Sequence, residues 1–491
     1  MTGDLFFYVN GKPFRVSHGE AFDTLSSFLR SRLGATGTKI VCEEGDCGAC
    51  SVLVGRPDGD VLTYRPLDSC ILFLHQINGA HVITVEGLKI AGLHPVQSAM
   101  IRCHGAQCGF CTPGFVVAMS TMYETGTEVT EKTVRDAVTG NLCRCTGYEP
   151  IIKAGLSVDP ASVKRLNELY PPQPMAGELR DHARTSLLLE SGERKFFAPV
   201  SIDEAVRFRQ ENPTTVVVQG GTDLVVQHNK RGLDPAIRMT LANIPSLAEH
   251  RLENGLLAVG ATVSLTTLED FFKNRVPQFH HILKLFGAPQ IKHAGTLAGN
   301  IANASPIADT VPFLYVMDAQ LELSGTAGTR LVPLQSFYLA YKVLDLKPGE
   351  IITRIFIPLP EPASSESIDG RDGEVLRLYK VSRRRNLDIS TVTAAIRMNV
   401  HGGRMSDVRI VFGGVGPMVI RVPRTEASLT GRDFSLEALR DAGEVAREEI
   451  RPIDDVRGSA EFRRTLAANL LLKFYYESSG SRTTEGLQAF A

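Results

Sequence analysis

Residues 41–50 read VCEEGDCGAC and place three cysteines in one short loop. Together with Cys70 they give C-x4-C-x2-C followed by a fourth cysteine, the plant-type ligand spacing for a [2Fe–2S] cluster. The glycines allow positive φ angles, so that backbone N–H groups can point at the sulfurs and offset the negative charge of a cluster. The stretch therefore predicts an iron–sulfur site, called here the first quartet, with four ligands: Cys42, Cys47, Cys50 and Cys70.

The residues around this loop predict a small sheet of the ferredoxin type. Asn10-Gly11 is a strong two-residue hairpin signal between short strands at 6–9 and 13–16. Residues 24–33 then carry apolar side chains at helical spacing.

Two other interpretations of the first quartet remain. Disulfides are expected in secreted chains, but the opening residues Met1–Asp4 do not start a basic-then-apolar signal peptide. Structural zinc usually uses paired C-x2-C knuckles, which this loop does not supply. The iron–sulfur interpretation is favoured over both.

A second quartet follows at Cys108, Cys111, Cys143 and Cys145, spaced C-x2-C and then C-x-C. Helices are predicted between the two pairs at 115–123 and 130–138, with Thr112-Pro113 and Thr130-x-x-Thr133 as their starts. Each pair would lie near a helix terminus, where unpaired N–H groups face the cluster. Spacing alone would also allow zinc. The ninth cysteine, Cys103, is predicted to be a small buried hydrophobic residue.

Composition narrows the class of protein. A chain of 491 residues predicts three or four domains, at about 100–200 residues each. The net charge of −1 argues against binding to nucleic acid or to a membrane surface. No apolar run reaches the roughly 18 residues of a membrane-spanning helix. Reduced, cluster-bound cysteines predict a cytoplasmic location.

Polar and proline-rich stretches suggest the domain boundaries. YPPQP at 170–174 lies within a polar segment, and a second proline-rich break covers 358–374. The predicted organisation is a ferredoxin-like domain, a helical domain around the second quartet, a linker, a middle domain and a C-terminal α+β domain, at 1–82, 83–160, 161–192, 193–365 and 372–480. In the last domain, strands are predicted at 391–400 and 408–413, with helices after Ser435.

Two glycine-rich segments in the middle of the chain suggest a phosphate-bearing ligand. The strand-like run at 216–218 leads into Gly220-Gly221-Thr222-Asp223, where successive N–H groups could hold a pyrophosphate. This is not the G-x-G-x-x-G dinucleotide fingerprint, and taken alone a plain tight turn is favoured. The second segment, 286–309, is rich in glycine and alanine, and its Thr296, Asn300 and Asp309 offer hydrogen bonds to a flat ligand.

The motifs CEEGDCGAC, QCGFCTPG and NLCRCTGY resemble the iron–sulfur region of the xanthine oxidase family of molybdenum hydroxylases, from about residue 5 to about residue 155. The glycine-rich segments resemble the flavin domain of the same family. The resemblance implies a multidomain α+β chain. Its parts would be a β-grasp plant-type ferredoxin domain, a helical [2Fe–2S] bundle, a two-subdomain FAD-binding domain like that of vanillyl-alcohol oxidase, and a C-terminal α+β domain.

The resemblance also implies roles for individual residues. Residues 217–224 match the pyrophosphate loop, Phe286 a flavin-contacting aromatic, and 296–300 the second phosphate and ribityl loop. Asp309 and Ile352 match contacts on the adenosine side, and Lys380 a flavin-contacting lysine. The implied FAD contacts are Val217, Val218, Gln219, Gly220, Gly221, Thr222, Asp223, Leu224, Phe286, Thr296, Leu297, Ala298, Gly299, Asn300, Asp309, Ile352 and Lys380. Gln107 and Cys145 match residues that touch the pterin of the molybdenum cofactor, which a partner subunit would carry.

One departure from the family concerns the flavin entrance. Where animal members carry acidic residues after the matching lysine, this chain has Arg385-Asn386-Leu387 before Asp388. A less negative entrance is compatible with docking of an anionic pyridine nucleotide.

By resemblance, the chain is expected to be a small subunit with two [2Fe–2S] clusters and FAD. It would accept electrons from a molybdopterin-binding large subunit that oxidises hypoxanthine and xanthine, and pass them to NAD+. The expected assembly is a heterotetramer of two small and two large subunits. The alternatives are the same module in an aldehyde or N-heterocycle dehydrogenase, or a stand-alone NAD(P)H:acceptor reductase. Carbon monoxide dehydrogenases normally keep the cluster and flavin parts on separate chains, which argues against that class for this chain.

Overall fold

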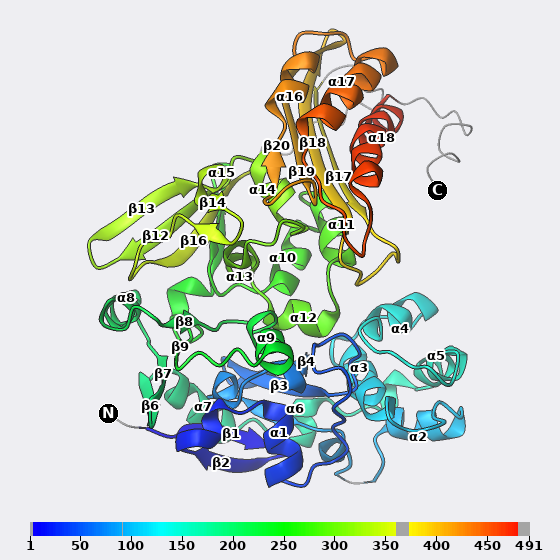
Figure 1. Cartoon of the computed structure of the whole chain (residues 1–491). Coiled ribbons are helices and arrows are strands. Elements are labelled where there is room, and N and C mark those ends of the chain that lie inside the picture. Colours follow the sequence, from blue (N-terminus) through cyan, green and yellow to red (C-terminus); the bar gives the residue numbers. More distant parts are fainter. Residues whose placement is uncertain (1–2, 91, 360–372, 480–491) are drawn as a thin grey trace. The chain divides into compact units, whose positions relative to one another are not determined.

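The computed structural model describes residues 3–90, 92–359 and 373–479 (Figure 1). The chain forms two compact units. Unit 1 comprises Met1–Ser246, Ser264–Thr266 and Gly287–Thr296, and unit 2 comprises Leu247–Val263, Thr267–Phe286 and Leu297–Ala491. Both units thus contain parts of the predicted FAD-binding domain, 193–365. Most of the predicted break at 358–374 lies outside the described residues.

Unit 1 begins with a mixed sheet in the strand order β2-β1-β5-β3-β4. Asn10 and Gly11 have φ angles of 49° and 77° and form the predicted hairpin turn. All five residues of β1 are buried. Its odd residues pack into a core that includes Leu25 and Phe28, and its even residues into a core that includes Met175 and Leu179, so both faces of the strand are covered. The strands are β1 (Leu5–Val9), β2 (Lys12–Val16), β3 (Ser51–Asp58), β4 (Val61–Asp68) and β5 (His81–Ile83).

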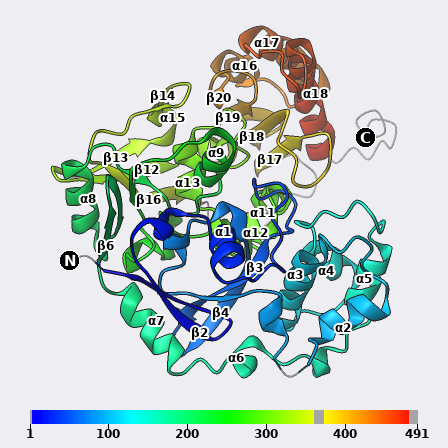
Figure 2. The ribbon, with the colours of Figure 1, turned by 60° about the horizontal axis from the view of Figure 1, so that its bottom comes forward.

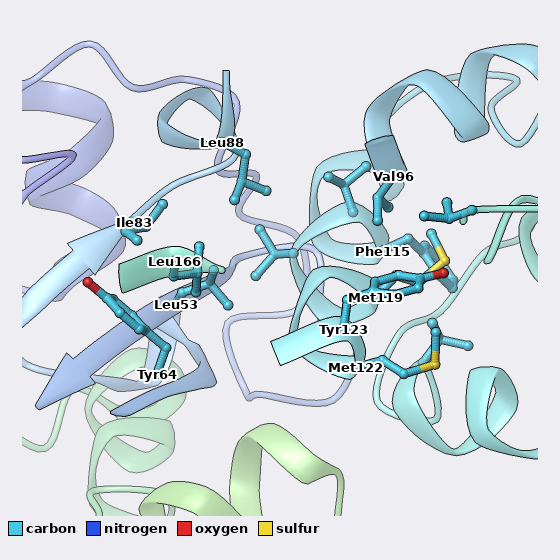
Figure 3. Close-up of a cluster of buried hydrophobic side chains, with 14 of the residues drawn as sticks. Leu53, Tyr64, Ile83, Leu88, Val96, Phe115, Met119, Met122, Tyr123 and Leu166 are labelled. Carbon is cyan, nitrogen blue, oxygen red and sulfur yellow. The ribbon is translucent and has the colours of Figure 1, made fainter. Parts of the chain in front are cut away.

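Four helices follow the sheet and pack against one another (Figure 2). They are α2 (Pro95–Arg102), α3 (Thr112–Glu124), α4 (Glu131–Ala137) and α5 (Glu149–Leu156). Figure 3 shows a buried cluster that joins residues of the sheet, such as Leu53 and Tyr64, to Phe115, Met119 and Tyr123 of α3. The predicted helix starts are confirmed, because Pro113 lies in the first turn of α3 and the Thr130 hydroxyl accepts a hydrogen bond from the backbone N–H of Thr133.

The segment predicted as a linker, 161–192, contains regular secondary structure. It contains α6 (Leu166–Leu169), α7 (Met175–Ala183) and β6 (Leu187–Ser191). The YPPQP stretch at 170–174 is free of helix and strand, as predicted. The reason is apolar patterning, since Met175, Ala176 and Leu179 fall on one buried face of α7.

A second sheet of unit 1 has the order β6-β7-β9-β8, and its helices are α8 and α9. The short helix α12 also belongs to unit 1 and packs on β4. The bounds are β7 (Arg194–Ala198), α8 (Ile202–Glu211), β8 (Val216–Val217), α9 (Leu224–Arg231), β9 (Ile237–Met239) and α12 (Pro289–Ala294).

Unit 2 contains a sheet in the order β10-β11-β16-β12-β13, a two-stranded hairpin and a sheet in the order β17-β18-β19-β20. The predicted C-terminal strands and helices are confirmed, and the Ser435 hydroxyl caps α17 by accepting from the backbone N–H of Ala438. The strands are β10 (His250–Glu253), β11 (Leu256–Gly260), β12 (Gln320–Gly325), β13 (Gly328–Pro333), β14 (Tyr338–Ala340), β15 (Val343–Leu344), β16 (Ile351–Pro358), β17 (Gly373–Val381), β18 (Val392–His401), β19 (Arg404–Gly413) and β20 (Ile420–Arg421). The helices are α10 (Leu265–Phe272), α11 (Pro277–Leu285), α13 (Leu297–Asn303), α14 (Val311–Val316), α15 (Leu334–Phe337), α16 (Pro423–Leu429), α17 (Leu436–Glu449) and α18 (Ala460–Ser478).

Within the described ranges, no helix is both long enough and apolar enough to cross a membrane.

Candidate functional site

The structure brings the first quartet together. Cys42 and Cys47 lie in the loop before β3, Cys50 lies at the start of that strand, and Cys70 lies in a short 3-10 turn after β4. The Cys42 thiol is within hydrogen-bond reach of Cys47 and Cys70, and Cys70 is within reach of Cys50. Three of the four are buried, with Cys47 7% exposed and Cys50 and Cys70 each 2% exposed.

Backbone N–H groups point at this quartet, as the glycine-rich loop predicts. The neighbouring thiols, together with the N–H groups of Glu44 and Asp46, hold the pKa of Cys42 well below its ordinary value. The N–H of Ala49 acts in the same direction on Cys47, although the Cys42 thiol and burial raise the pKa of Cys47 overall. Such donors would offset the charge of bound thiolates.

The second quartet forms two pairs of sulfurs. The Sγ atoms of Cys108 and Cys145 are 3.6 Å apart, and Cys111 and Cys143 lie within hydrogen-bond reach of each other. Burial raises the pKa of the Cys111 thiol to about 12, so binding of iron would release its proton. Cys111 immediately precedes α3, as predicted, whereas Cys143 and Cys145 lie in the loop between α4 and α5.

The residues fit a binuclear cluster. A [2Fe–2S] cluster has two irons and is held by four cysteines. Two sulfur pairs, as found at the second quartet, match that requirement, with one pair for each iron.

Hydrogen bonds join the loops of the two quartets. The backbone N–H of Leu142 donates to the carbonyl oxygen of Cys47 (3.0 Å), and the Asn141 side chain donates to the carbonyl oxygen of Gly48 (3.0 Å). Gln290 of α12, which is 1% exposed, donates to both Ser51 Oγ and Asn141 Oδ1 at 3.2 Å. The loop that carries Cys47 and Cys50 and the loop that carries Cys143 and Cys145 are thus hydrogen-bonded to each other, and both are hydrogen-bonded to α12.

The first glycine-rich segment contributes a row of free donors. The backbone N–H groups of residues 219–223 have no hydrogen-bond partner among the residues that the structure describes. Gly221 has φ 73°, and a Cβ on Gly220 would lie 2.3 Å from the carbonyl oxygen of Ala294, so the loop packs closely on the segment that leads to Thr296. Successive free N–H groups fit the predicted binding of a pyrophosphate.

An apolar cluster connects the loop predicted to bind FAD (217–224, called the flavin loop below) to the first quartet. Cys50 and Cys70 are buried in one cluster with Val218, next to the loop's glycines, and Val225 of α9. Val218 and Val225 are 1% and 0% exposed. Two cysteines of the first quartet therefore pack in a buried apolar cluster with Val218 of the loop.

In unit 2, the structure pairs two of the predicted FAD contacts with each other. Lys380 Nζ lies 2.5 Å from Asp309 Oδ2, and the two side chains are 2% and 6% exposed. The Ser390 hydroxyl donates to the other carboxylate oxygen (2.6 Å), so Asp309 has partners at both oxygens. Opposite charge is what allows both groups to be buried.

The remaining predicted FAD contacts in unit 2 lie on α13, on β16 and at the end of α11. Asn300, on α13, accepts a hydrogen bond from the Thr310 hydroxyl at 2.6 Å. Leu297 and Ala298 are buried on the same helix, while Gly299 is exposed. Ile352 is buried on β16, and Phe286 is half-buried at the end of α11.

The loop after Lys380 is dominated by arginine, as expected. Arg384 pairs with Asp388 at 2.6 Å. Burial and the nearby Arg385 lower the pKa of His281 on α11. The surroundings of this loop therefore carry positive charge.

Sequence reasoning did not single out several polar residues that organise these sites. Ser390 and Thr310 fix predicted contacts in unit 2, and Asn141, Asn229 and Gln290 join loops in unit 1. Most of their partners lie more than 70 positions away along the chain, and no local motif marks them. Cys103 is half-buried rather than fully buried, with its Sγ 3.6 Å from Ser157 Oγ.

Three family models match the chain. They are a [2Fe–2S] binding domain at 84–156, the FAD binding domain in molybdopterin dehydrogenase at 191–360, and the CO dehydrogenase flavoprotein C-terminal domain at 377–478. Xanthine dehydrogenase 1 of Arabidopsis thaliana is 28% identical over 96% of this chain, and aldehyde oxidase 1 of Bos taurus is 29% identical over 97%. The chain spans 39% of the length of each of these relatives.

Solved structures agree with the family models. Carbon monoxide dehydrogenase from Hydrogenophaga pseudoflava matches with a TM-score of 0.52 at 27% identity, over 57% of this chain and 94% of that one. Quinoline 2-oxidoreductase from Pseudomonas putida 86 also matches with a TM-score of 0.52, at 25% identity, over 57% and 95% of the two chains.

Proposed function

This chain belongs to the xanthine oxidase family of molybdenum hydroxylases, whose iron–sulfur and flavin domains it carries, and we propose that it is the small, electron-transfer subunit of a xanthine dehydrogenase. In this proposal, a partner subunit holds molybdopterin and oxidises hypoxanthine or xanthine. Electrons then pass through the second quartet, the first quartet and FAD to NAD+.

The observation that carries the proposal is the apolar cluster shared by Cys50, Cys70, Val218 and Val225. It brings two ligands of the first quartet into buried apolar contact with Val218 of the flavin loop, which supports short-range electron exchange between the two. The hydrogen bond from Leu142 to Cys47 gives a similarly short link between the two quartets.

The proposed cofactor sites follow the predicted residues, apart from Asp309, whose ion pair with Lys380 replaces its predicted contact on the adenosine side. Two [2Fe–2S] clusters supply one-electron carriers, and FAD supplies the exchange between single electrons and a hydride. The proposed iron ligands are Cys42, Cys47, Cys50, Cys70, Cys108, Cys111, Cys143 and Cys145. In unit 1, the free N–H groups at 219–223 would hold the FAD pyrophosphate, and in unit 2 Asp309 would hold Lys380 in place for its flavin contact.

The second quartet is proposed to face the partner. Cys108, Cys145 and Gln107 are exposed, whereas most of the first quartet is buried. Gln107 and Cys145 would touch the partner's pterin, in a heterotetramer of two small and two large subunits.

Co-expression with a molybdopterin-binding large subunit of this family tests the function. The pair should form NADH when given hypoxanthine or xanthine, and the chain alone should not. Metal and flavin analysis should give about four irons, at two per [2Fe–2S] cluster, and one FAD per chain. Zinc in place of iron, or a single cluster signal in electron paramagnetic resonance, would contradict the proposal.

The same experiment separates the alternatives. Similarity to bovine aldehyde oxidase keeps an aldehyde or N-heterocycle dehydrogenase open, because that relative is as similar as the xanthine dehydrogenases. Oxidation of aldehydes or nicotinate in preference to purines would favour it. Rapid NADH oxidation by the chain alone, with no gain from the partner, would favour a stand-alone reductase.

Replacement of Gln107 tests the docking face. Gln107→Ala should slow reduction of the clusters by purine roughly tenfold, while NADH still reduces the flavin at the wild-type rate. Equal loss of both half-reactions would indicate a general folding defect and would contradict the proposed contact.

A further inference from the structure

Asn229, near the end of α9, makes two hydrogen bonds to the loops of the first quartet. Its Nδ2 atom donates to the carbonyl oxygen of Cys70 at 2.8 Å and to the carbonyl oxygen of Glu43 at 2.9 Å. Cys70 is the fourth cysteine of the quartet, and Glu43 directly follows Cys42. One carboxamide therefore links the two separate segments that supply this quartet.

The chemistry of the side chain suits this role. A carboxamide nitrogen carries two hydrogens, which is the number that two carbonyl acceptors require. Glu43 has φ 57°, in the left-handed region that non-glycine residues rarely adopt, so its carbonyl is turned by an unusual backbone conformation. An aspartate in place of Asn229 would keep the shape but would present only acceptors to both carbonyls.

A second side chain holds the other end of the flavin loop to the same domain. Gln76 Nε2 donates to the carbonyl oxygen of Gln219 at 2.9 Å, and its Oε1 accepts from the N–H of Phe73 at 2.9 Å. A Cβ on Gly221 would lie 2.9 Å from that Oε1 atom. The loop with its free N–H groups is thus fixed before the glycines by Gln76 and after them, through α9, by Asn229.

We infer that Asn229 is a positioning residue that ties the flavin loop to the ligand loops of the first quartet and so fixes the environment of the first cluster. This inference rests on the proposed function, because it needs iron at the quartet. It goes beyond that proposal by assigning a role in electron transfer to a residue that lies outside every cysteine and flavin motif.

The test is a redox titration of the whole chain, followed by electron paramagnetic resonance. In Asn229→Asp, the added negative charge opposes the extra electron of the reduced cluster. The ratio of oxidised to reduced first cluster at a fixed potential should rise about tenfold, which is about 59 mV for one electron. In Asn229→Leu, which adds no charge, the line shape of the first cluster's signal should change. The second cluster should be unaffected in both variants.

Asn254→Asp is the matched control, since it makes the same chemical change in an exposed turn of unit 2. It should leave both clusters at their wild-type potentials. A first cluster with unchanged potential and line shape in both Asn229 variants would overturn the inference, as would an equal shift of both clusters. A wild-type chain that binds no iron would instead overturn the proposed function.

Discussion

The two cysteine quartets differ in where they lie. Cys47, Cys50 and Cys70 of the first quartet are at most 7% exposed, whereas Cys108 and Cys145 of the second quartet are exposed. The first quartet contacts the flavin loop through an apolar cluster. The exposed cysteines of the second quartet include Cys108, which is next to the exposed Gln107.

Under the proposed function, this difference predicts a direction of electron transfer. A buried redox group exchanges electrons with groups packed against it inside the protein, and an exposed one can do so with a docked partner. The second quartet is therefore suited to receive electrons from outside and the first to deliver them to the flavin. Four predictions test this comparison.

The largest effect should come from removing one ligand of each quartet. Cys70→Ser should remove the first cluster and also weaken FAD binding, because the Cys70 side chain packs in one apolar cluster with Val218 of the flavin loop. Cys145→Ser should remove the second cluster and leave FAD bound. Each variant should keep about two irons, the content of one [2Fe–2S] cluster. Equal loss of FAD in both variants would contradict the claim that the first quartet, and not the second, packs with the flavin loop.

A change on the flavin side should leave both quartets intact. Asp309→Asn leaves the buried Lys380 without its counter-charge and should destabilise unit 2 by about 3–5 kcal/mol, with loss of FAD. Adding Lys380→Met should recover part of the stability by removing the unpaired charge. Thermal unfolding and flavin fluorescence measure these effects. Loss of either cluster signal in Asp309→Asn would contradict the claim that the Asp309–Lys380 pair supports FAD binding and not the clusters.

Acid should destabilise the region of the first quartet. His75 is 1% exposed, neither ring nitrogen has a hydrogen-bond partner in the structure, and its ring stacks on Phe196 at 4.1 Å. Burial, and then the nearby Arg238, lower the pKa of His75 well below 6.5. The unfolded chain therefore binds a proton that the folded chain does not, so stability is present above pH 6.5 and is lost as pH falls below it.

The expected loss from this one histidine is about 1.4 kcal/mol per pH unit. Denaturant unfolding between pH 7 and pH 5 should show this loss of stability. In His75→Phe, the free energy of unfolding should depend less steeply on pH, because up to one proton fewer is taken up on unfolding. Identical slopes in the two proteins would show that His75 does not titrate in this way.

The smallest effect should come from the ninth cysteine. Cys103→Ser changes a half-buried side chain that contacts Ser157, so stability should move by no more than about 0.5 kcal/mol. Iron content and both cluster signals should match the wild type. Loss of iron in this variant would mean that a ligand set has been assigned wrongly.

Local patterns predicted much of the fold. The Asn10-Gly11 hairpin, the Thr130 cap and the helix after Ser435 depend on neighbouring residues, and all three are found where expected. The cysteine spacings likewise predicted two groups of thiols, and the structure brings each group together.

Contacts between distant segments could not be predicted in this way. Asn229 binds the carbonyl of Cys70 across 159 positions, and Gln290 binds Asn141 across 149. The folding of the predicted linker also depends on distant partners, since α7 packs on strands of the ferredoxin-like sheet. Such contacts depend on tertiary packing, which composition and periodicity do not specify.

Rapid freeze-quench electron paramagnetic resonance after mixing with NADH tests the central claim most directly. Electrons that enter at the flavin should reach the first cluster before the second, because only the first quartet packs with the flavin loop. The account predicts that the signal of the first cluster rises first and that the second follows. A second-cluster signal that rises earlier, or at an unchanged rate in a Cys70→Ser chain that retains its flavin, would contradict it.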